Sequence, residues 1–218
     1  MGYMGAAAGQ YEKTRKLPAS CEWTIRQDKL TRRRMVIGKD YVFIGVPRTG
    51  SMSIASWLHV DHDGEWYGSH HETVVPAEHA HKFTFAVVRN PYERMASLWR
   101  YISTVFWPNA DWRKSEEARQ WQDAGQVIGC DMETFVEWCS TQTDNRWWCQ
   151  SDILAGVRID ALLRFEDFPS CLAVLPFAES LGGLPHLGAT QRACLTAAQR
   201  AAIREHSWPD FAAYGYAV

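Results

Sequence analysis

Short apolar runs alternate along this chain with longer stretches in which apolar residues recur every three or four positions. The apolar runs predict strands at residues 41–46, 65–68, 82–88 and 159–165, of which the second is short. The periodic stretches predict helices at residues 51–58, 91–104, 132–139 and 195–206. Strands that alternate with helices usually form a parallel sheet with helices on both faces. We therefore expect an α/β protein with a three-layer P-loop-like fold, whose central parallel sheet has about four to five strands flanked by helices.

The length of 218 residues suits one α/β domain with a complete core. Residues 1–20 are small, polar and charged, so we expect a flexible N-terminal arm there and a single domain over residues 21–218. No apolar run near the start is long enough for a signal segment or a membrane span, which predicts a soluble, cytoplasmic protein without a membrane partner. The formal net charge of −2 argues against nucleic acid as a partner.

A run of basic residues occupies positions 26–39, directly before the first predicted strand. Such a run most often forms a solvated face of the protein. The alternative is a rim that attracts an anionic ligand, and the sequence leaves both interpretations open.

The turn after the first predicted strand reads GVPRTGSMS, residues 45–53. Backbone N–H groups at the start of a helix, approached closely through glycine, form an anion site. Gly45 and Gly50 match the spacing of the P-loop of nucleotide hydrolases, but Ser51 stands where that pattern requires lysine. The positive charge lies earlier, on Arg48. The turn therefore predicts an anion site other than that of a nucleotide-hydrolysing P-loop.

A second candidate segment, FAVVRNPYERMASLWRYI at residues 85–102, joins a predicted buried strand to a helix. Arg89 ends the strand, at the edge of a parallel sheet where ligands bind, and Ser97 follows two helical turns later. Arg89 and Ser97 could grip one phosphate together. The alternative is that Arg89 only pairs with Glu93 and that Ser97 is merely small. The helix is expected to bury a stripe formed by Tyr92, Met95, Trp99 and Ile102.

The two segments, about forty residues apart, resemble the cofactor signatures of sulfotransferases of the carbohydrate type. In that family the first loop reads PKTG(G/S)xS and the second VR(N/D)P(F/W/Y)xRxxS, which PRTGSMS and VRNPYERMAS fit, with arginine in place of the lysine. Three further stretches resemble family segments, namely RWWCQSDIL, LLRFEDF and REHSWPDFAAYGY. The resemblance covers roughly residues 40–216.

This resemblance implies that the chain binds 3′-phosphoadenosine 5′-phosphosulfate (PAPS) and releases 3′-phosphoadenosine 5′-phosphate (PAP). The first loop would hold the 5′-phosphosulfate, and Arg48 would also stabilise the charge on the leaving group. Arg89 and Ser97 would hold the 3′-phosphate. Glu166 is either structural, behind the loops, or part of the site. The cofactor-binding residues implied are Arg48, Thr49, Gly50, Ser51, Met52, Ser53, Arg89 and Ser97.

Six of the eight histidines fall between residues 59 and 81. Their spacing lacks a recurrent metal-ligand pattern, so we expect no metal site. Transfer of a sulfuryl group to a hydroxyl needs a base, which histidine can provide near neutral pH. His70 and His71 follow the second predicted strand, where similar family members carry their base. His71 fits the family's register better, His70 stays a candidate, and Glu72 is a lesser one.

The function implied by the resemblance is transfer of a sulfuryl group from PAPS to an acceptor hydroxyl, on a carbohydrate by family analogy. One alternative is a catalytically impaired protein that binds PAPS or PAP, which the arginine at position 48 keeps open. Another is a P-loop kinase-like phosphotransferase, which would need the lysine that is absent after Gly50. Tryptophans within residues 104–130 are candidates either for acceptor contacts or for helix packing.

Overall fold

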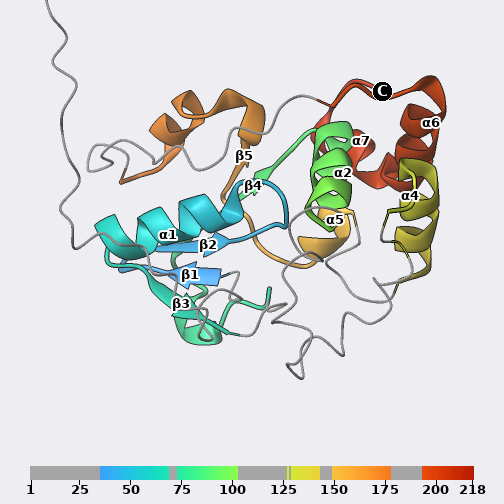
Figure 1. Cartoon of the computed structure of the whole chain (residues 1–218). Coiled ribbons are helices and arrows are strands. Elements are labelled where there is room, and N and C mark those ends of the chain that lie inside the picture. Colours follow the sequence, from blue (N-terminus) through green and yellow to red (C-terminus); the bar gives the residue numbers. More distant parts are fainter. Residues whose placement is uncertain (1–34, 69–72, 103–126, 128, 143–148, 178–192) are drawn as a thin grey trace, which may run out of the picture. The chain divides into compact units, whose positions relative to one another are not determined.

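Five strands form one mixed sheet in the computed structural model, which describes residues 35–68, 73–102, 127, 129–142, 149–177 and 193–218. The strands are β1 (Met35–Ile37), β2 (Tyr41–Ile44), β3 (Glu65–Tyr67), β4 (Phe83–Val88) and β5 (Ala161–Arg164), in the order β3-β1-β2-β4-β5 (Figure 1). β1 pairs antiparallel with β2 and with β3, whereas the β2–β4 and β4–β5 pairs are parallel.

The number of strands agrees with the predicted four to five, but the sheet is mixed and not parallel as predicted. Only β2, β4 and β5 pair in parallel, because β1 is inserted between β2 and β3. β1 comes from the basic run at residues 26–39, in which only three consecutive apolar residues mark it. A short turn joins β1 to β2, and strands joined by so short a connection must run antiparallel.

The four strands and four helices predicted from the pattern are all present, with ends that differ by a few residues. The predicted helices are α1 (Ser51–Asp61), α2 (Pro91–Arg100), α4 (Met132–Thr141) and α6 (Ala197–His206). The pattern missed the short helices α5 (Gln150–Ile153) and α7 (Trp208–Tyr214) and the 3₁₀ turns η3 (Ala77–His79), η8 (Phe165–Asp167) and η9 (Ser170–Val174). α5 and the 3₁₀ turns span only three to five residues each, too few for a helical period to show.

Alternate residues of β2 and β4 enter two different apolar clusters, one on each face of the sheet. Phe43 and Phe85 pack with residues of α1 and η9, while Ile44 and Ala86 pack with Ile153 of α5. Both strands are therefore buried on both faces, as their continuous apolar sequence predicts.

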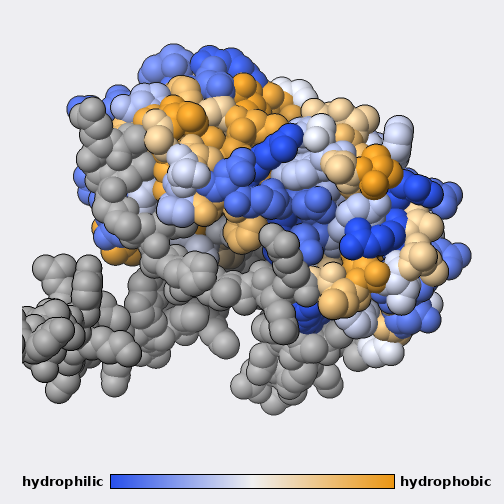
Figure 2. All heavy atoms as spheres, turned by 90° about the horizontal axis from the view of Figure 1, so that it is seen from above, coloured by the Kyte–Doolittle hydropathy of each residue, from blue (hydrophilic) through white to orange (hydrophobic). Residues whose placement is uncertain are grey.

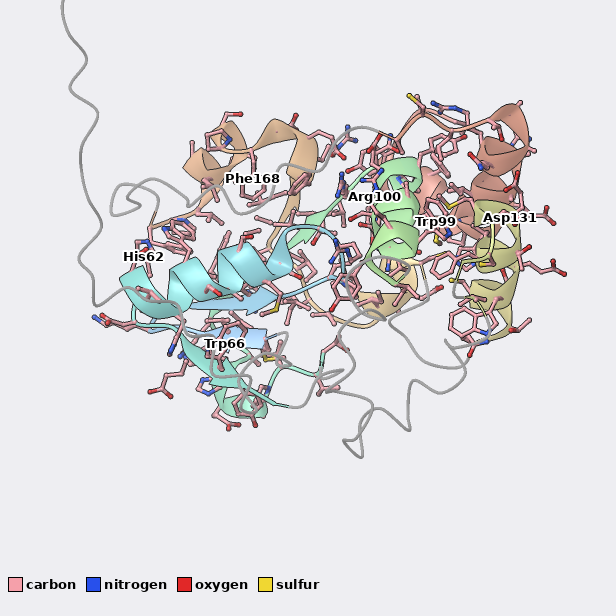
Figure 3. The ribbon with its side chains drawn as sticks, in the orientation of Figure 1. His62, Trp66, Trp99, Arg100, Asp131 and Phe168 are labelled. Atoms are coloured by element: carbon pink, nitrogen blue, oxygen red, sulfur yellow. The ribbon has the colours of Figure 1, made fainter. Side chains whose placement is uncertain are left out.

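A third apolar cluster joins α2, α4, α6 and α7. The predicted stripe of α2 lies in it: Tyr92, Met95 and Ile102 are buried, and Trp99 lies between α2 and α4, where its indole N–H donates to the carbonyl of Cys130 at 3.1 Å (Figure 3). This confirms the packing role predicted for the stripe. α2 thus anchors the segment that follows β4 to the C-terminal helices.

Residues 32–218 form one unit, and the predicted arm at residues 1–20 lies outside the described residues. Within the described part of the chain, no helix is long and apolar enough to cross a membrane. On the face seen in Figure 2, hydrophilic residues form a band between apolar areas.

Candidate anion-binding site

The loop between β2 and α1 has a backbone shape that depends on glycine. Arg48 and Gly50 both adopt left-handed conformations, with φ of 68° and 76°. A Cβ atom at Gly50 would lie 2.8 Å from Cε2 of Phe165, so a side chain there would be both strained and crowded. The turn that follows β2 therefore has little freedom to vary at this position.

Three consecutive carbonyl groups of this loop accept hydrogen bonds from side chains. The Val46 carbonyl accepts from the hydroxyl of Thr49 at 2.9 Å, and the Pro47 carbonyl accepts from Nε of Arg94 at 3.1 Å. Nη1 of Arg89 donates to the carbonyl of Arg48 at 3.4 Å. The acceptor groups of the loop are thus engaged by the fold itself, which is what a loop that binds an anion through its N–H groups requires.

The N-terminus of α1 supplies such N–H groups. Ser51, Met52 and Ser53 are its first three residues, and the amides of the first helical turn have no partner within a helix. No side chain caps this end through its N-cap residue Gly50, and the first turn contains no acidic residue. Met52 is 43% exposed, so this turn reaches solvent. Among the described residues, this helix end therefore has unpaired donors, and it has the positive potential that attracts an anion.

The side chain of Arg48 points to α2. Its Nε and Nη2 atoms donate to the hydroxyl of Ser97 at 3.2 and 3.0 Å, and its guanidinium carbon lies 4.5 Å from the centre of the Tyr101 ring. Ser97 is buried, with 3% exposure. Two residues that are 49 positions apart in sequence, and that were both predicted to bind the cofactor, are therefore in direct contact.

Arg89 lies next to this pair, at the carboxyl end of β4. It is 5% exposed, its guanidinium lies 4.7 Å from the centre of the Phe165 ring, and Nη2 is 3.6 Å from a carboxylate oxygen of Glu93. The pairing with Glu93 was the structural alternative for Arg89, and it is present. It leaves the positive charge of Arg48 without a carboxylate partner among the described residues.

Burial lowers the pKa of Arg48 and that of Arg89, since it disfavours the charged form of each guanidinium. The nearby charges of Arg89, Arg94 and Arg100 lower the pKa of Arg48 further. Arg94 is itself fully buried, and its Nη2 atom has no hydrogen-bond partner within the described residues. The guanidinium groups of Arg48, Arg89 and Arg94 thus lie near one another beside the loop, an arrangement that favours a bound anion.

A buried glutamine fixes the backbone of Arg89. The amide oxygen of Gln150 accepts from the N–H of Arg89 at 2.8 Å, and its Nε2 donates to the carbonyl of Arg89 at 2.8 Å. Nε2 also donates to Oδ2 of Asp210 at 3.1 Å. The buried carboxylate of Asp210 further accepts from the N–H groups of Gln150 and Ser151, so its charge is stabilised by three donor groups.

A second carboxylate, that of Glu166, contacts the backbone next to Arg89. Glu166 accepts from the N–H of Asn90 at 2.7 Å and from the hydroxyl of Tyr216 at 3.0 Å. Glu166 therefore has the structural contacts that were one of its two predicted roles. Burial, and next the charge of Glu166, raise the pKa of the Tyr216 hydroxyl, which keeps its proton available for this bond.

Sequence reasoning assigned no role to Gln150 or Asp210. Both belong to stretches that resemble family segments, RWWCQSDIL and REHSWPDFAAYGY. For Asp210 the available signal was a single charged residue in the otherwise apolar segment of α7, since buried polar groups are normally hydrogen-bonded to something specific. Gln150 gave no such signal, because α5 also contains Ser151 and Asp152. The partner of each residue could not be read from the sequence, because it lies about 60 positions away.

The predicted bases His70 and His71, together with Glu72, lie outside the described residues. β3, which precedes them, ends at Tyr67 and runs in the same direction as β2, because each pairs antiparallel with β1. Its carboxyl end therefore lies at the same edge of the sheet as the loop after β2, two strand spacings or about 10 Å away.

Other histidines make structural contacts. Nδ1 of His59 lies 2.6 Å from the carbonyl of Gly64, and the ring of His62 meets the ring of Trp57 edge-on at 4.6 Å. His62 lies at the end of α1, well away from α2 (Figure 3). Within the described residues, no group of three or more His, Cys, Asp or Glu side chains could hold a metal ion.

Comparison with known proteins leaves this site to be interpreted from its own geometry. No protein-family model matches the chain, and no curated protein and no solved structure matches it significantly.

Proposed function

We propose that this chain is a PAPS-dependent sulfotransferase with a P-loop-like arrangement of β2, its loop and α1. The observation that carries the proposal is the contact between the first loop and α2, in which Arg48 donates twice to Ser97 beside Arg89. The two segments that resemble cofactor signatures thus form one cationic site at one edge of the sheet. A nucleotide with two separate anionic groups suits a site that combines a free helix N-terminus with a pair of arginines.

In this proposal the N–H groups of Ser51 and Met52, with the hydroxyls of Ser51 and Ser53, bind the 5′-phosphosulfate. Arg89 and Ser97 bind the 3′-phosphate. Gln150 and Glu166 hold the Arg89–Asn90 backbone in place through the hydrogen bonds described above. Such support matters because a displacement of about 1 Å at a site of this kind can cost two orders of magnitude in rate.

The reaction would be an in-line transfer. The oxygen of the acceptor hydroxyl forms a bond to sulfur while the bond between sulfur and the bridging oxygen breaks, and PAP leaves with the electron pair of that bond. The proton of the acceptor passes to a base, His71 in this proposal, with His70 as the alternative. The amide groups at the start of α1 stabilise the charge that develops on the leaving phosphate. A carbohydrate hydroxyl is the acceptor that the family resemblance implies.

The test measures binding of PAP and of adenosine 5′-phosphate, which lacks the 3′-phosphate, by titration calorimetry. Wild-type protein should bind PAP at least tenfold more tightly. Arg89→Ala should remove most of that preference and leave binding of adenosine 5′-phosphate nearly unchanged. Arg158→Ala, which deletes an arginine before β5 at the opposite edge of the sheet, is the matched control and should change neither affinity. Equal losses for both nucleotides in Arg89→Ala would contradict the assignment of the 3′-phosphate.

Turnover is tested with labelled PAPS against carbohydrate, phenolic and lipid acceptors. His71→Ala should abolish transfer and leave the affinity for PAP nearly intact, whereas a variant that turns over normally would exclude His71 as the base. His70→Ala, assayed in parallel, distinguishes the two neighbours.

A second candidate function is binding of PAPS or PAP without catalysis. The observation that favours it is the arginine at position 48, whose guanidinium is engaged with Ser97 and Tyr101. Tight binding of PAP with no transfer to any acceptor class would support this second function over the first.

A further inference from the structure

We infer that Arg48 is a specificity residue for the 3′-phosphate, which it binds together with Arg89 and Ser97, and that it does not contact the bridging oxygen at the transfer site. This inference rests on the proposed function and reassigns one residue within it. It separates the cofactor site into two parts, an arginine-rich part for the 3′-phosphate and an amide-rich part for the 5′-phosphosulfate.

The first support is the direction of the side chain. Arg48 belongs to the loop after β2, yet two of its donor groups converge on the hydroxyl of Ser97 on α2. A guanidinium carries five N–H groups, and two of them are used here. Among the described residues the remaining three have no hydrogen-bond partner, and Arg89 lies close by, where its Nη1 donates to the backbone carbonyl of Arg48.

The second support is the number of contacts that hold this orientation. The face of the guanidinium lies on the ring of Tyr101 at 4.5 Å. The backbone of Arg48 is held in its left-handed conformation by hydrogen bonds from Arg94 and Arg89 to the two carbonyls at Pro47 and Arg48. Turning the side chain towards the start of α1 would break both donor contacts to Ser97 and the ring contact together.

The third support is the match of charge. A phosphate monoester carries up to two negative charges, and two guanidinium groups with one hydroxyl can balance and bind it. Arg48 and Arg89 lie close together, and the positive charge of Arg89 lowers the pKa of Arg48, so a doubly negative phosphate between them would offset their repulsion. The 5′-phosphosulfate has its own donors in the free amides of α1.

The contacts of Arg48 with Ser97 and Tyr101 depend on properties that arginine has and lysine lacks. Nε and Nη2 donate side by side to one oxygen, and the flat guanidinium stacks on an aromatic ring. An ammonium group has neither the fork nor the flat face. Arg48→Lys is therefore expected to disturb recognition of the 3′-phosphate even though it preserves the charge.

The test uses PAP and adenosine 5′-phosphate with four proteins: wild type, Arg48→Lys, Ser97→Ala and the double variant. Arg48→Lys should weaken PAP binding by about tenfold and change adenosine 5′-phosphate binding by less than about twofold. The two substitutions should be non-additive for PAP, because both remove parts of one site. Thermal unfolding of each variant confirms that it is folded. Tyr101→Leu, which removes the ring contact to Arg48, supplies a milder perturbation of Arg48 with the same expected selectivity.

Two outcomes would overturn the inference, and they are distinguishable. Equal weakening of both nucleotides by Arg48→Lys, with a wild-type preference for PAP intact, would show that Arg48 contacts the 5′ group and would leave the proposed function standing. A wild-type protein that binds PAP no more tightly than adenosine 5′-phosphate would reject the proposed function together with the inference.

Discussion

Replacing Gln150 with methionine should destabilise the protein more than any single exposed substitution. Gln150 is fully buried, and its side chain makes three hydrogen bonds, two to the backbone of Arg89 and one to Asp210. Methionine has a similar length but can make none of them. The N–H and carbonyl groups of Arg89 would then be buried without partners.

The magnitude follows from the groups left unpaired. Each unsatisfied buried donor or acceptor costs about 1–3 kcal/mol, so the two groups of Arg89 together cost about 2–6 kcal/mol. Asp210 keeps the bonds from the N–H groups of Gln150 and Ser151, which are backbone donors and survive the substitution. For a chain of this size, a loss of about 4 kcal/mol lowers Tm by roughly 8–16 °C.

The assay is chemical denaturation of Gln150→Met beside a matched control, Gln142→Met. Gln142 lies at the end of α4, where its half-buried amide donates to Trp138 and Thr141. Water can replace those bonds, so the control should lose no more than about 0.5–1 kcal/mol. If the free energy of unfolding of Gln150→Met falls within about 1 kcal/mol of wild type, the reasoning from buried unpaired groups is refuted.

Two further predictions concern the loop and the pH dependence of stability. Gly50→Ala should cost about 2–4 kcal/mol, because it combines a left-handed backbone with a contact of 2.8 Å to Phe165, whereas Gly156→Ala, at φ 74° with nothing within 4 Å, should cost only about 1–2 kcal/mol. Equal losses in thermal unfolding of the two variants would exclude the contact as a cause. Burial, with the charge of Asp63 as a smaller cause, raises the pKa of Tyr41 to about 12 from its usual 10, so its contribution to stability is complete below pH 10 and is lost as the pH rises through 12. Tyr41→Phe should therefore flatten the fall in the free energy of unfolding between pH 10 and 12, and an unchanged slope would contradict this.

The predicted elements were recovered because their signals are local. The continuous apolar runs of β2 and β4 and the helical repeat of α2 depend on residues that are close in sequence. β1 was missed because three apolar residues after a basic run carry too little periodicity. Its insertion next to β2 changed the sheet from parallel to mixed, since strand order depends on pairing across the whole chain.

The candidate site likewise has residues that local motifs identify and an arrangement that depends on long-range contacts. Glycine at position 50, arginine at 48 and 89 and serine at 97 were identified from the two motifs, because residue type and spacing already indicate an anion site. Their mutual arrangement, with Arg48 on Ser97, was not contained in those motifs.

The sequence by itself determined which segments become strands and helices and which residue types stand at the turns after them. Those properties depend on side-chain periodicity and on the backbone preferences of single residues. Only the tertiary structure decided that Gln150 holds the backbone of Arg89 and that Arg48 points away from its own helix. Those contacts join residues roughly 50 to 60 positions apart, and they exist because the packing of the sheet and of α2 brings buried polar groups together that must satisfy one another.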